Sequence, residues 1–295
     1  MLKIALDSII PQITNDVEIV VSDNASTDGT NELLEMYSKK YPYIKYKKHE
    51  TNLGAERNII SVIENSNGEY CWLLGSDYAL IMNSINIILS EIQSGYSIIN
   101  CNRVWCDFNL NPIYVQSWLD PKIPTYTIRS QNQFELIDYY LHVISLGGLF
   151  SYISTLIFRR DLWLASDNKL SYEIEAYPHV YKMLHIMDNG GVLRYISAPL
   201  VFCRGDNDSY LQENGMGKRI LIDIVGYIKL AELFYRNKPE IKAAFLRALR
   251  LQNNRSTIEM LKSNLFEEEW ENKEITLIKA GYVPIYLNSD YYEWI

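Results

Sequence analysis

The stretch Glu18-Ile19-Val20-Val21-Ser22-Asp23-Asn24-Ala25-Ser26-Thr27-Asp28-Gly29-Thr30 decides the fold of this 295-residue chain. A run of apolar, mostly β-branched residues ends in small, polar and acidic residues, and a helical pattern over 31–40 follows. This order predicts a buried strand, a tight turn and a helix. Because ligands bind at the carboxyl ends of strands in open α/β sheets, we expect Asp23 and Asn24 to face a ligand. Asp28 is expected only to form the turn.

The composition is typical of a globular protein, with 48% apolar and 22% charged residues. A net charge of −8 argues against nucleic-acid binding. No apolar run approaches the roughly 20 residues that cross a bilayer, and no signal peptide opens the chain, so a cytoplasmic location is expected. The four cysteines have no zinc-site spacing and are predicted to be free, buried thiols.

Strand and helix patterns alternate along the first two thirds of the chain. The strand patterns cover 43–48, 70–74, 96–101, 152–158 and 192–196, and the helical patterns cover 1–12, 59–66, 84–93, 131–145 and 177–187. This alternation predicts an α/β fold with a mainly parallel sheet flanked by helices. Residues 102–133 are expected to form a long loop or a hairpin insert.

Beyond about residue 216 the pattern is only helical, over 218–235, 239–250, 256–263 and 267–280. We therefore expect an α/β domain at 1–215 and a helical appendage at 216–295.

Four motifs in this order resemble those of family 2 glycosyltransferases with the GT-A fold. They are the strand and turn of 18–30, Asn52-Leu53-Gly54 followed by Arg57, Leu74-Gly75-Ser76-Asp77-Tyr78, and Phe202-Cys203-Arg204-Gly205. The resemblance spans about residues 1–210. It implies inverting transfer of a sugar from a nucleotide-diphosphate donor to a glycan or lipid-linked acceptor. Such transfer builds surface polysaccharides such as O-antigen or capsule, here at the inner face of the membrane, with peripheral membrane association.

The same resemblance implies roles for single residues. Asp23 would accept a ring N–H of the nucleotide base, with Asn24 beside it, and Arg57 would lie near the ribose or the diphosphate. Asp77 would hold Mg²⁺ or Mn²⁺ against the diphosphate, where the family usually has several carboxylates. Arg204 would steady the leaving group, and Asp206 or Asp208 is a weaker additional metal ligand.

The general base is implied by position. Residues 152–159 and Tyr177-Pro178-His179-Val180-Tyr181 resemble the abequosyltransferase-like branch of the family, whose members add a dideoxyhexose or similar sugar. Counting back from Gly190 and Pro199 places His179 where relatives carry a catalytic Asp. Histidine is a competent base near neutral pH. A structural role for His179 stays open, and Glu173 and Glu175 are the alternative bases.

Two departures from the family pattern keep other functions open. The strand that the family places before residues 1–12 is missing, and Asp77 is the sole acidic residue of its motif. A degenerate, non-catalytic subunit that binds sugars or partner enzymes is therefore the main alternative. A nucleotidyltransferase would need a Gly-rich phosphate loop near its start, which this sequence lacks. A purely structural module is disfavoured because polar residues cluster at the predicted strand ends.

Overall fold

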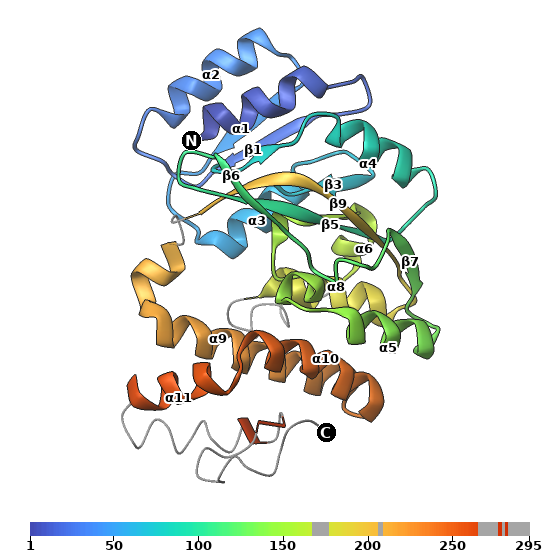
Figure 1. Ribbon diagram of the computed structural model, residues 1–295. Coiled ribbons are helices and arrows are strands. Elements are labelled where there is room, and N and C mark those ends of the chain that lie inside the picture. Colours follow the sequence, from blue (N-terminus) through green and yellow to red (C-terminus); the bar gives the residue numbers. More distant parts are fainter. Residues whose placement is uncertain (167–176, 206–208, 265–276, 279–280, 283–295) are drawn as a thin grey trace.

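The computed structural model describes residues 1–166, 177–205, 209–264, 277–278 and 281–282. Within these residues a central mixed sheet has helices packed on both of its faces (Figure 1). The predicted class, a mixed α/β sheet flanked by helices, is confirmed.

The N-terminal part of the chain forms a small parallel unit around β1 (Ile19–Asp23) and β2 (Ile44–Lys48). Helices α1 (Leu2–Ile9) and α2 (Thr30–Lys40) cover this pair at the top of Figure 1. One apolar cluster joins the four elements, through the buried side chains of Leu6, Ile19, Leu34, Tyr37 and Ile44. The strand, turn and helix predicted over 18–40 are therefore confirmed.

The main sheet has the strand order β3-β8-β5-β9-β4, with β6 beside β5 and β7 beside β9. Its strands are β3 (Tyr70–Trp72), β4 (Ala79–Leu80), β5 (Ile98–Cys106), β6 (Pro112–Gln116), β7 (Tyr126–Arg129), β8 (Leu156–Arg159) and β9 (Val192–Arg204). Among the described strands of this sheet, β5 and β9 pair in parallel and the other pairs are antiparallel. The expectation of a mainly parallel sheet is wrong, because an apolar run predicts burial and carries no information on strand direction.

Strand pleating divides the interior of the protein between the two faces of the sheet. Ile98 and Ile99 are adjacent in β5, yet each lies in a different apolar cluster, as side-chain alternation requires. One cluster packs under α4 (Ser84–Ile92). The other packs against α5 (Gln133–His142), α8 (Pro178–Asp188) and the C-terminal helices.

The C-terminal helices are α9 (Ser209–Tyr235), α10 (Pro239–Gln252) and α11 (Arg255–Asn264). They lie below the sheet in Figure 1, and buried residues such as Tyr227 and Phe245 belong to the same cluster as β5 and β9. The predicted division between 215 and 216 falls inside α9 and stays a prediction. The helix predicted over 267–280 falls almost wholly outside the described residues.

Several element boundaries differ from the sequence prediction. Strand β5 extends to Cys106 and β9 to Arg204, where strands over 96–101 and 192–196 are predicted. Helix α3 (Ala55–Glu64) begins directly after Gly54, which has φ +81°, so Arg57 lies in its first turn. A 3-10 turn at Ile153–Thr155 replaces the start of the strand predicted over 152–158. There the Thr155 hydroxyl donates to the Tyr152 carbonyl (2.8 Å), a local bond that competes with strand pairing. The hairpin alternative for 102–133 is confirmed by the β5–β6 pair.

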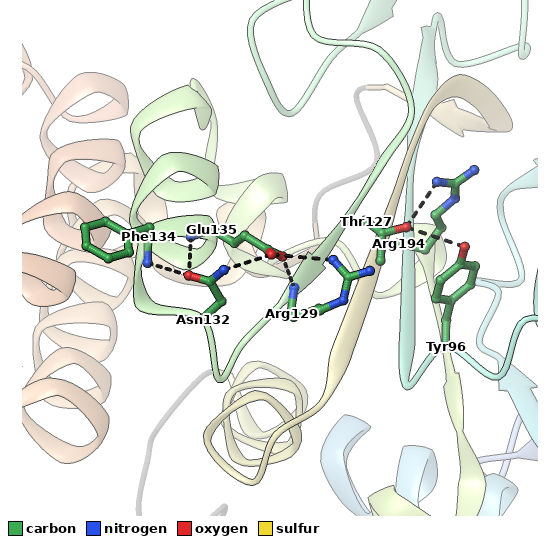
Figure 2. A network of polar contacts seen from close by, with 7 residues as sticks. All are labelled: Tyr96, Thr127, Arg129, Asn132, Phe134, Glu135 and Arg194. Carbon is green, nitrogen blue, oxygen red and sulfur yellow. Dashed lines mark hydrogen bonds and ion pairs between the residues drawn. The ribbon is translucent and has the colours of Figure 1, made fainter.

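A polar network fixes α5 to the sheet (Figure 2). Asn132 caps α5, because its Oδ1 accepts the backbone N–H groups of Phe134 and Glu135. The Glu135 carboxylate accepts the Arg129 N–H of β7 (2.8 Å). Further along β7, the Thr127 hydroxyl accepts a hydrogen bond from Arg194 of β9 (3.2 Å). Side chains therefore place α5 at one position along the sheet.

Gly147 is required by the packing of a buried tryptophan. An added Cβ at Gly147 would overlap the indole ring of Trp118, which is fully buried and stacks on Tyr152 with ring centroids 5.0 Å apart.

We expect Gly147→Ala to lower the free energy of unfolding by about 2 kcal/mol, because overpacking displaces a rigid ring. Chemical denaturation measures the effect. The matched control is Gly217→Ala in α9, where the new Cβ would meet Leu261 at an ordinary 3.7 Å. That control should be neutral or should stabilise by about 0.5–1 kcal/mol, as alanine does in a helix. Equal effects of the two substitutions would contradict the packing argument.

Candidate active site

Asp23 lies at the carboxyl end of β1 and is 3% exposed. Its Oδ1 accepts the backbone N–H of Ser26 (2.9 Å), which closes the turn. Its Oδ2 is buried and has no hydrogen-bond partner among the described residues. A buried carboxylate oxygen without a donor is unfavourable unless a ligand supplies one. The geometry therefore fits an oxygen that receives an N–H from a bound molecule.

Asn24 joins this turn to the loop before α3. Its Oδ1 accepts the backbone N–H of Leu53 (2.8 Å), and its Nδ2 donates to Oδ1 of Asn52 (2.7 Å). The same Asn52 oxygen accepts the N–H of Gly54 (2.8 Å). Both polar ends of the Asn24 amide are thus used within the protein, and its observed contribution is to hold the start of α3 beside the end of β1.

Arg57 is exposed in the first turn of α3 and makes no ion pair with the described residues. A surface pair with Glu56 or Glu64, the ordinary alternative for such a residue, does not form. Asp28 is fully exposed and accepts a hydrogen bond from the Thr30 hydroxyl (2.7 Å), as expected for a turn residue.

Asp77 lies in the turn that joins β3 to β4 and is partly buried. An added Cβ at Gly75 would lie 2.8 Å from Asp77 Oδ1, so any larger residue would displace the Asp77 carboxylate from its observed position. The Gly75 N–H donates to the Ser154 hydroxyl (3.1 Å). The indole Nε1 of Trp72 donates to the Ser154 carbonyl (2.9 Å). Ser154 therefore supports the Asp77 turn from a distant part of the chain.

Arg204 ends β9 and is buried against that turn. Its Nε donates to the backbone carbonyl of Asp77 (3.1 Å), and its Nη1 donates to the carbonyl of Phe108. The guanidinium also lies over the Phe108 ring, 5.5 Å from the centroid. The structure thus brings together Asp77 and Arg204, which are 127 residues apart.

His179 stands at the start of α8 and is 8% exposed. Its Nε2 lies 3.1 Å from the carbonyl oxygen of Ser151 and therefore donates to it. Burial lowers the pKa of the imidazole to about 4, so the ring is neutral near pH 7. The segment from Ser151 to Ser154 links His179 to the Asp77 turn.

The hydrogen bonds described above divide the site residues into two groups, and the segment 151–154 connects the second group to His179. One group joins Asp23 and Asn24 to the start of α3, and the other joins Asp77 to Arg204. Sequence reasoning did not single out Ser154 or Phe108, although Ser154 belongs to the stretch 152–159 quoted for the family branch. The alternative bases Glu173 and Glu175, and the additional ligands Asp206 and Asp208, lie outside the described residues.

The described residues offer a divalent metal one carboxylate, that of Asp77, and no group of three or more acidic, His or Cys side chains. Mg²⁺ needs no more from a protein when substrate phosphates and water complete its shell. The site therefore fits a metal that is bound together with a diphosphate.

An α/β sheet with a buried carboxylate at the end of β1, and a buried arginine hydrogen-bonded to the backbone of the Asp77 turn, is compatible with a transferase that binds a nucleotide donor. Residues 1–150 match the family model for glycosyl transferase family 2. The chain is 40% identical to the abequosyltransferase RfbV of Salmonella typhimurium, over 78% of this chain and 69% of that protein. The chain belongs to glycosyltransferase family 2. It is an inverting glycosyltransferase that uses a nucleotide-sugar donor.

Solved structures agree on the fold. Staphylococcus aureus TarS 1–349 in complex with UDP has a TM-score of 0.66 at 16% identity, over 95% of this chain and 76% of that chain. The mannosyltransferase PcManGT from Pyrobaculum calidifontis, in complex with GDP-Man and Mn²⁺, has a TM-score of 0.51 at 15% identity, over 95% and 81%. The comparisons give no support to the alternative of a non-catalytic subunit. None of the helices among the described residues combines the length and apolar character needed to cross a membrane.

The low pKa of His179 predicts a pH-dependent stability. Between about pH 4 and the ordinary histidine pKa of about 6.5, the unfolded chain binds a proton that the folded chain excludes. Stability must therefore rise with pH across this window, by up to about 3 kcal/mol.

Replacing the ring with a neutral amide in His179→Gln should flatten that part of the profile. Urea unfolding at half-unit steps from pH 4 to 7 measures it. The partly exposed His142, whose Nε2 lies 3.5 Å from Asp138 Oδ1, serves as control in His142→Gln. A wild-type profile that is already flat would contradict the buried, neutral state of His179.

Proposed function

We propose that this glycosyltransferase transfers a deoxyhexose of the abequose type to a glycan acceptor carried on a lipid, during assembly of a surface polysaccharide. The 40% identity to an abequosyltransferase supports the sugar class. A lipid-linked acceptor would bring the protein to the inner face of the cell membrane.

The proposed nucleotide-sugar site rests mainly on Oδ2 of Asp23, which is buried and has no hydrogen-bond partner among the described residues. Each nucleobase of the common sugar donors offers an N–H at its pairing edge, and a buried carboxylate oxygen is a strong acceptor for it. Asn24 would keep the start of α3 against this base site. Arg57, which has no ion-pair partner among the described residues, would then reach the ribose or diphosphate of the same donor.

Asp77 would hold Mg²⁺ or Mn²⁺ on the donor diphosphate, and the ion would neutralise charge on the leaving nucleoside diphosphate. Arg204 is already directed at the Asp77 turn by its hydrogen bond to the Asp77 carbonyl. From there its guanidinium would stabilise the leaving group as negative charge develops.

His179 would accept the proton of the acceptor hydroxyl. Its neutral form is the one a base needs, and with Nε2 donating to the Ser151 carbonyl, the lone pair lies on Nδ1. A pKa of about 4 makes it a weaker base than the near-neutral optimum. A glutamate at 173 or 175 is therefore the competing base.

Calorimetric titration with UDP, GDP, CDP and dTDP, with and without Mn²⁺, tests the donor site. We expect one nucleotide to bind, and Mn²⁺ to tighten its binding. Asp23→Asn should weaken this binding about tenfold or more, because an N–H to a charged acceptor is lost. Asp77→Asn should abolish the effect of Mn²⁺ and leave metal-free binding unchanged.

Asp28→Asn, which changes an exposed carboxylate of the same turn, is the matched control and should bind like the wild type. Absence of binding of all four nucleotides to the wild-type chain would refute the proposed donor site. Equal losses in Asp28→Asn and Asp23→Asn would instead point to a general effect of charge.

Sugar transfer in His179→Gln tests the base. A catalytic base predicts a fall in kcat of about 10²- to 10⁴-fold, with nucleotide affinity within twofold of the wild type. A structural role predicts a lower Tm and weaker nucleotide binding together. If Glu173→Gln or Glu175→Gln loses transfer while His179→Gln keeps it, the base is that glutamate.

A further inference from the structure

Arg103, in the middle of β5, is 1% exposed. Its Nε donates to Oε1 of Gln116 in β6 (2.8 Å), and its Nη1 donates to the Sγ of Cys203 in β9 (2.9 Å). Its Nη2 is buried and has no hydrogen-bond partner among the described residues. The guanidinium thus has a donor that nothing in the described part of the chain uses.

Aromatic rings frame this guanidinium. Its central carbon lies 3.6 Å from the ring centroid of Tyr152, 5.1 Å from that of Trp105 and 5.2 Å from that of Trp118. These faces stabilise a cation and hold its plane in one orientation. Tyr152 and Trp105 are partly exposed, so the frame extends from the buried charge to the surface.

No carboxylate of the described residues pairs with Arg103, in contrast to two partly buried arginines elsewhere in the protein. Arg194 pairs with Glu91 (2.9 Å), and Arg219 pairs with Asp223. A guanidinium stays charged at any physiological pH. Burial of a charge without a counter-charge is unfavourable, and a fold that needed only packing here would be served by an apolar side chain.

Arg103 lies next to the active site described above. The thiol of Cys203 that it contacts lies near the hydroxyl of Tyr78 and, after burial, contributes to the raised pKa of that hydroxyl. Tyr78 directly follows Asp77 in the turn, and Cys203 directly precedes Arg204 in β9. One side-chain contact, from Arg103 to Cys203, therefore separates the guanidinium from the neighbour of Arg204.

We propose that Arg103 is a second substrate-binding arginine of this site, whose Nη2 binds a phosphate oxygen of a substrate. The inference rests on the proposed function, since the phosphate belongs either to the donor diphosphate or to the phosphate carrier of the acceptor. The bound oxyanion supplies the missing counter-charge and uses the remaining donor. The fork geometry of the guanidinium and its aromatic frame fix the direction of the contact.

A purely structural role is the competing explanation, in which Arg103 joins β5 to β6 and β9. It accounts for the bonds to Gln116 and Cys203 but not for a buried charge that no described carboxylate pairs and a donor that no described residue uses. The two explanations predict opposite effects of an apolar replacement. A structural arginine is needed for stability, whereas a substrate-binding one is needed for affinity.

The experiment compares Arg103→Met with Arg194→Met. Arg194 is the matched control, since it is also a strand arginine near a ring, Tyr96, but has a carboxylate partner and lies in the network of Figure 2. Calorimetry measures binding of the nucleoside diphosphate that the wild type selects, and of a short-chain prenyl diphosphate. Thermal unfolding of each variant is measured in parallel.

We expect Arg103→Met to keep the wild-type Tm and to lose at least tenfold in affinity for one of the two probes, while Arg194→Met binds both normally and has a lower Tm. Loss for the nucleotide assigns Arg103 to the donor diphosphate, and loss for the prenyl diphosphate assigns it to the acceptor carrier. Unchanged affinity for both probes would overturn the inference.

If Arg103→Met does not fold, Arg103→Lys replaces it in the same binding and unfolding measurements. Lysine keeps the positive charge but lacks the paired N–H donors of the guanidinium. The two proposals fail separately. Absence of nucleotide binding by the wild type refutes the donor site, whereas nucleotide and prenyl diphosphate binding that is insensitive to both Arg103 variants refutes only the role of Arg103.

Discussion

The parallel pairing of β5 with β9 is the constraint on which the rest of the structure depends. The two strands are paired from Ile98 with Leu193 to Cys106 with Arg204, and the pairing crosses an irregularity around Asn102. The buried Asn102 amide compensates for it, because it donates to the Ser197 carbonyl (2.8 Å) and accepts from the Trp118 N–H (3.0 Å). If this pairing failed, the two strands would separate, and the two apolar clusters would lose the sheet against which both of them pack.

The same pairing delivers two buried cations to one end of the sheet. Beyond the irregularity, Arg103 pairs with Val201, and the last residue of the ladder is Arg204. Neither guanidinium forms an ion pair with a described carboxylate. Natural proteins accept lower stability where a function requires it, and uncompensated buried charge is one such feature. The β5–β9 pair therefore holds two buried guanidinium groups that have no carboxylate partner among the described residues.

The sequence was sufficient for features that arise within a short stretch of chain. The apolar run before Asp23, followed by small polar residues, predicted both the strand and the place of Asp23 at its carboxyl end, because burial and turn formation depend on neighbouring residues. The order of the motifs predicted the family. The free, buried state of the four cysteines was also predicted correctly.

Features set by long-range pairing could not be predicted in this way. Arg103 stands between Asn102 and Val104, and a charged residue in such a pattern is typical of an exposed strand position. Its burial results from the position of Trp118 and Tyr152, which the chain brings in from two other segments. The antiparallel direction of β8 depends on pairing with β5, from Ile98 with Phe158 to Asn100 with Leu156. The support that Ser154 gives to the Asp77 turn likewise depends on a contact with Gly75, 79 residues away.

The charge balance at the Asp77 turn gives a physical reason why a single carboxylate can serve this site. Several carboxylates repel a diphosphate until a metal ion is bound, so a site that contains them depends on the metal for its attraction. Here the buried Arg204 donates a hydrogen bond to the backbone carbonyl of Asp77, and the Arg103 guanidinium contacts Cys203, the residue before Arg204. The fixed charge of this group favours a diphosphate even before a metal ion arrives, because guanidinium groups cannot lose their protons. In the proposed mechanism the arginines would add to the leaving-group stabilisation that a metal ion supplies, so a motif with a single acidic residue is compatible with catalysis.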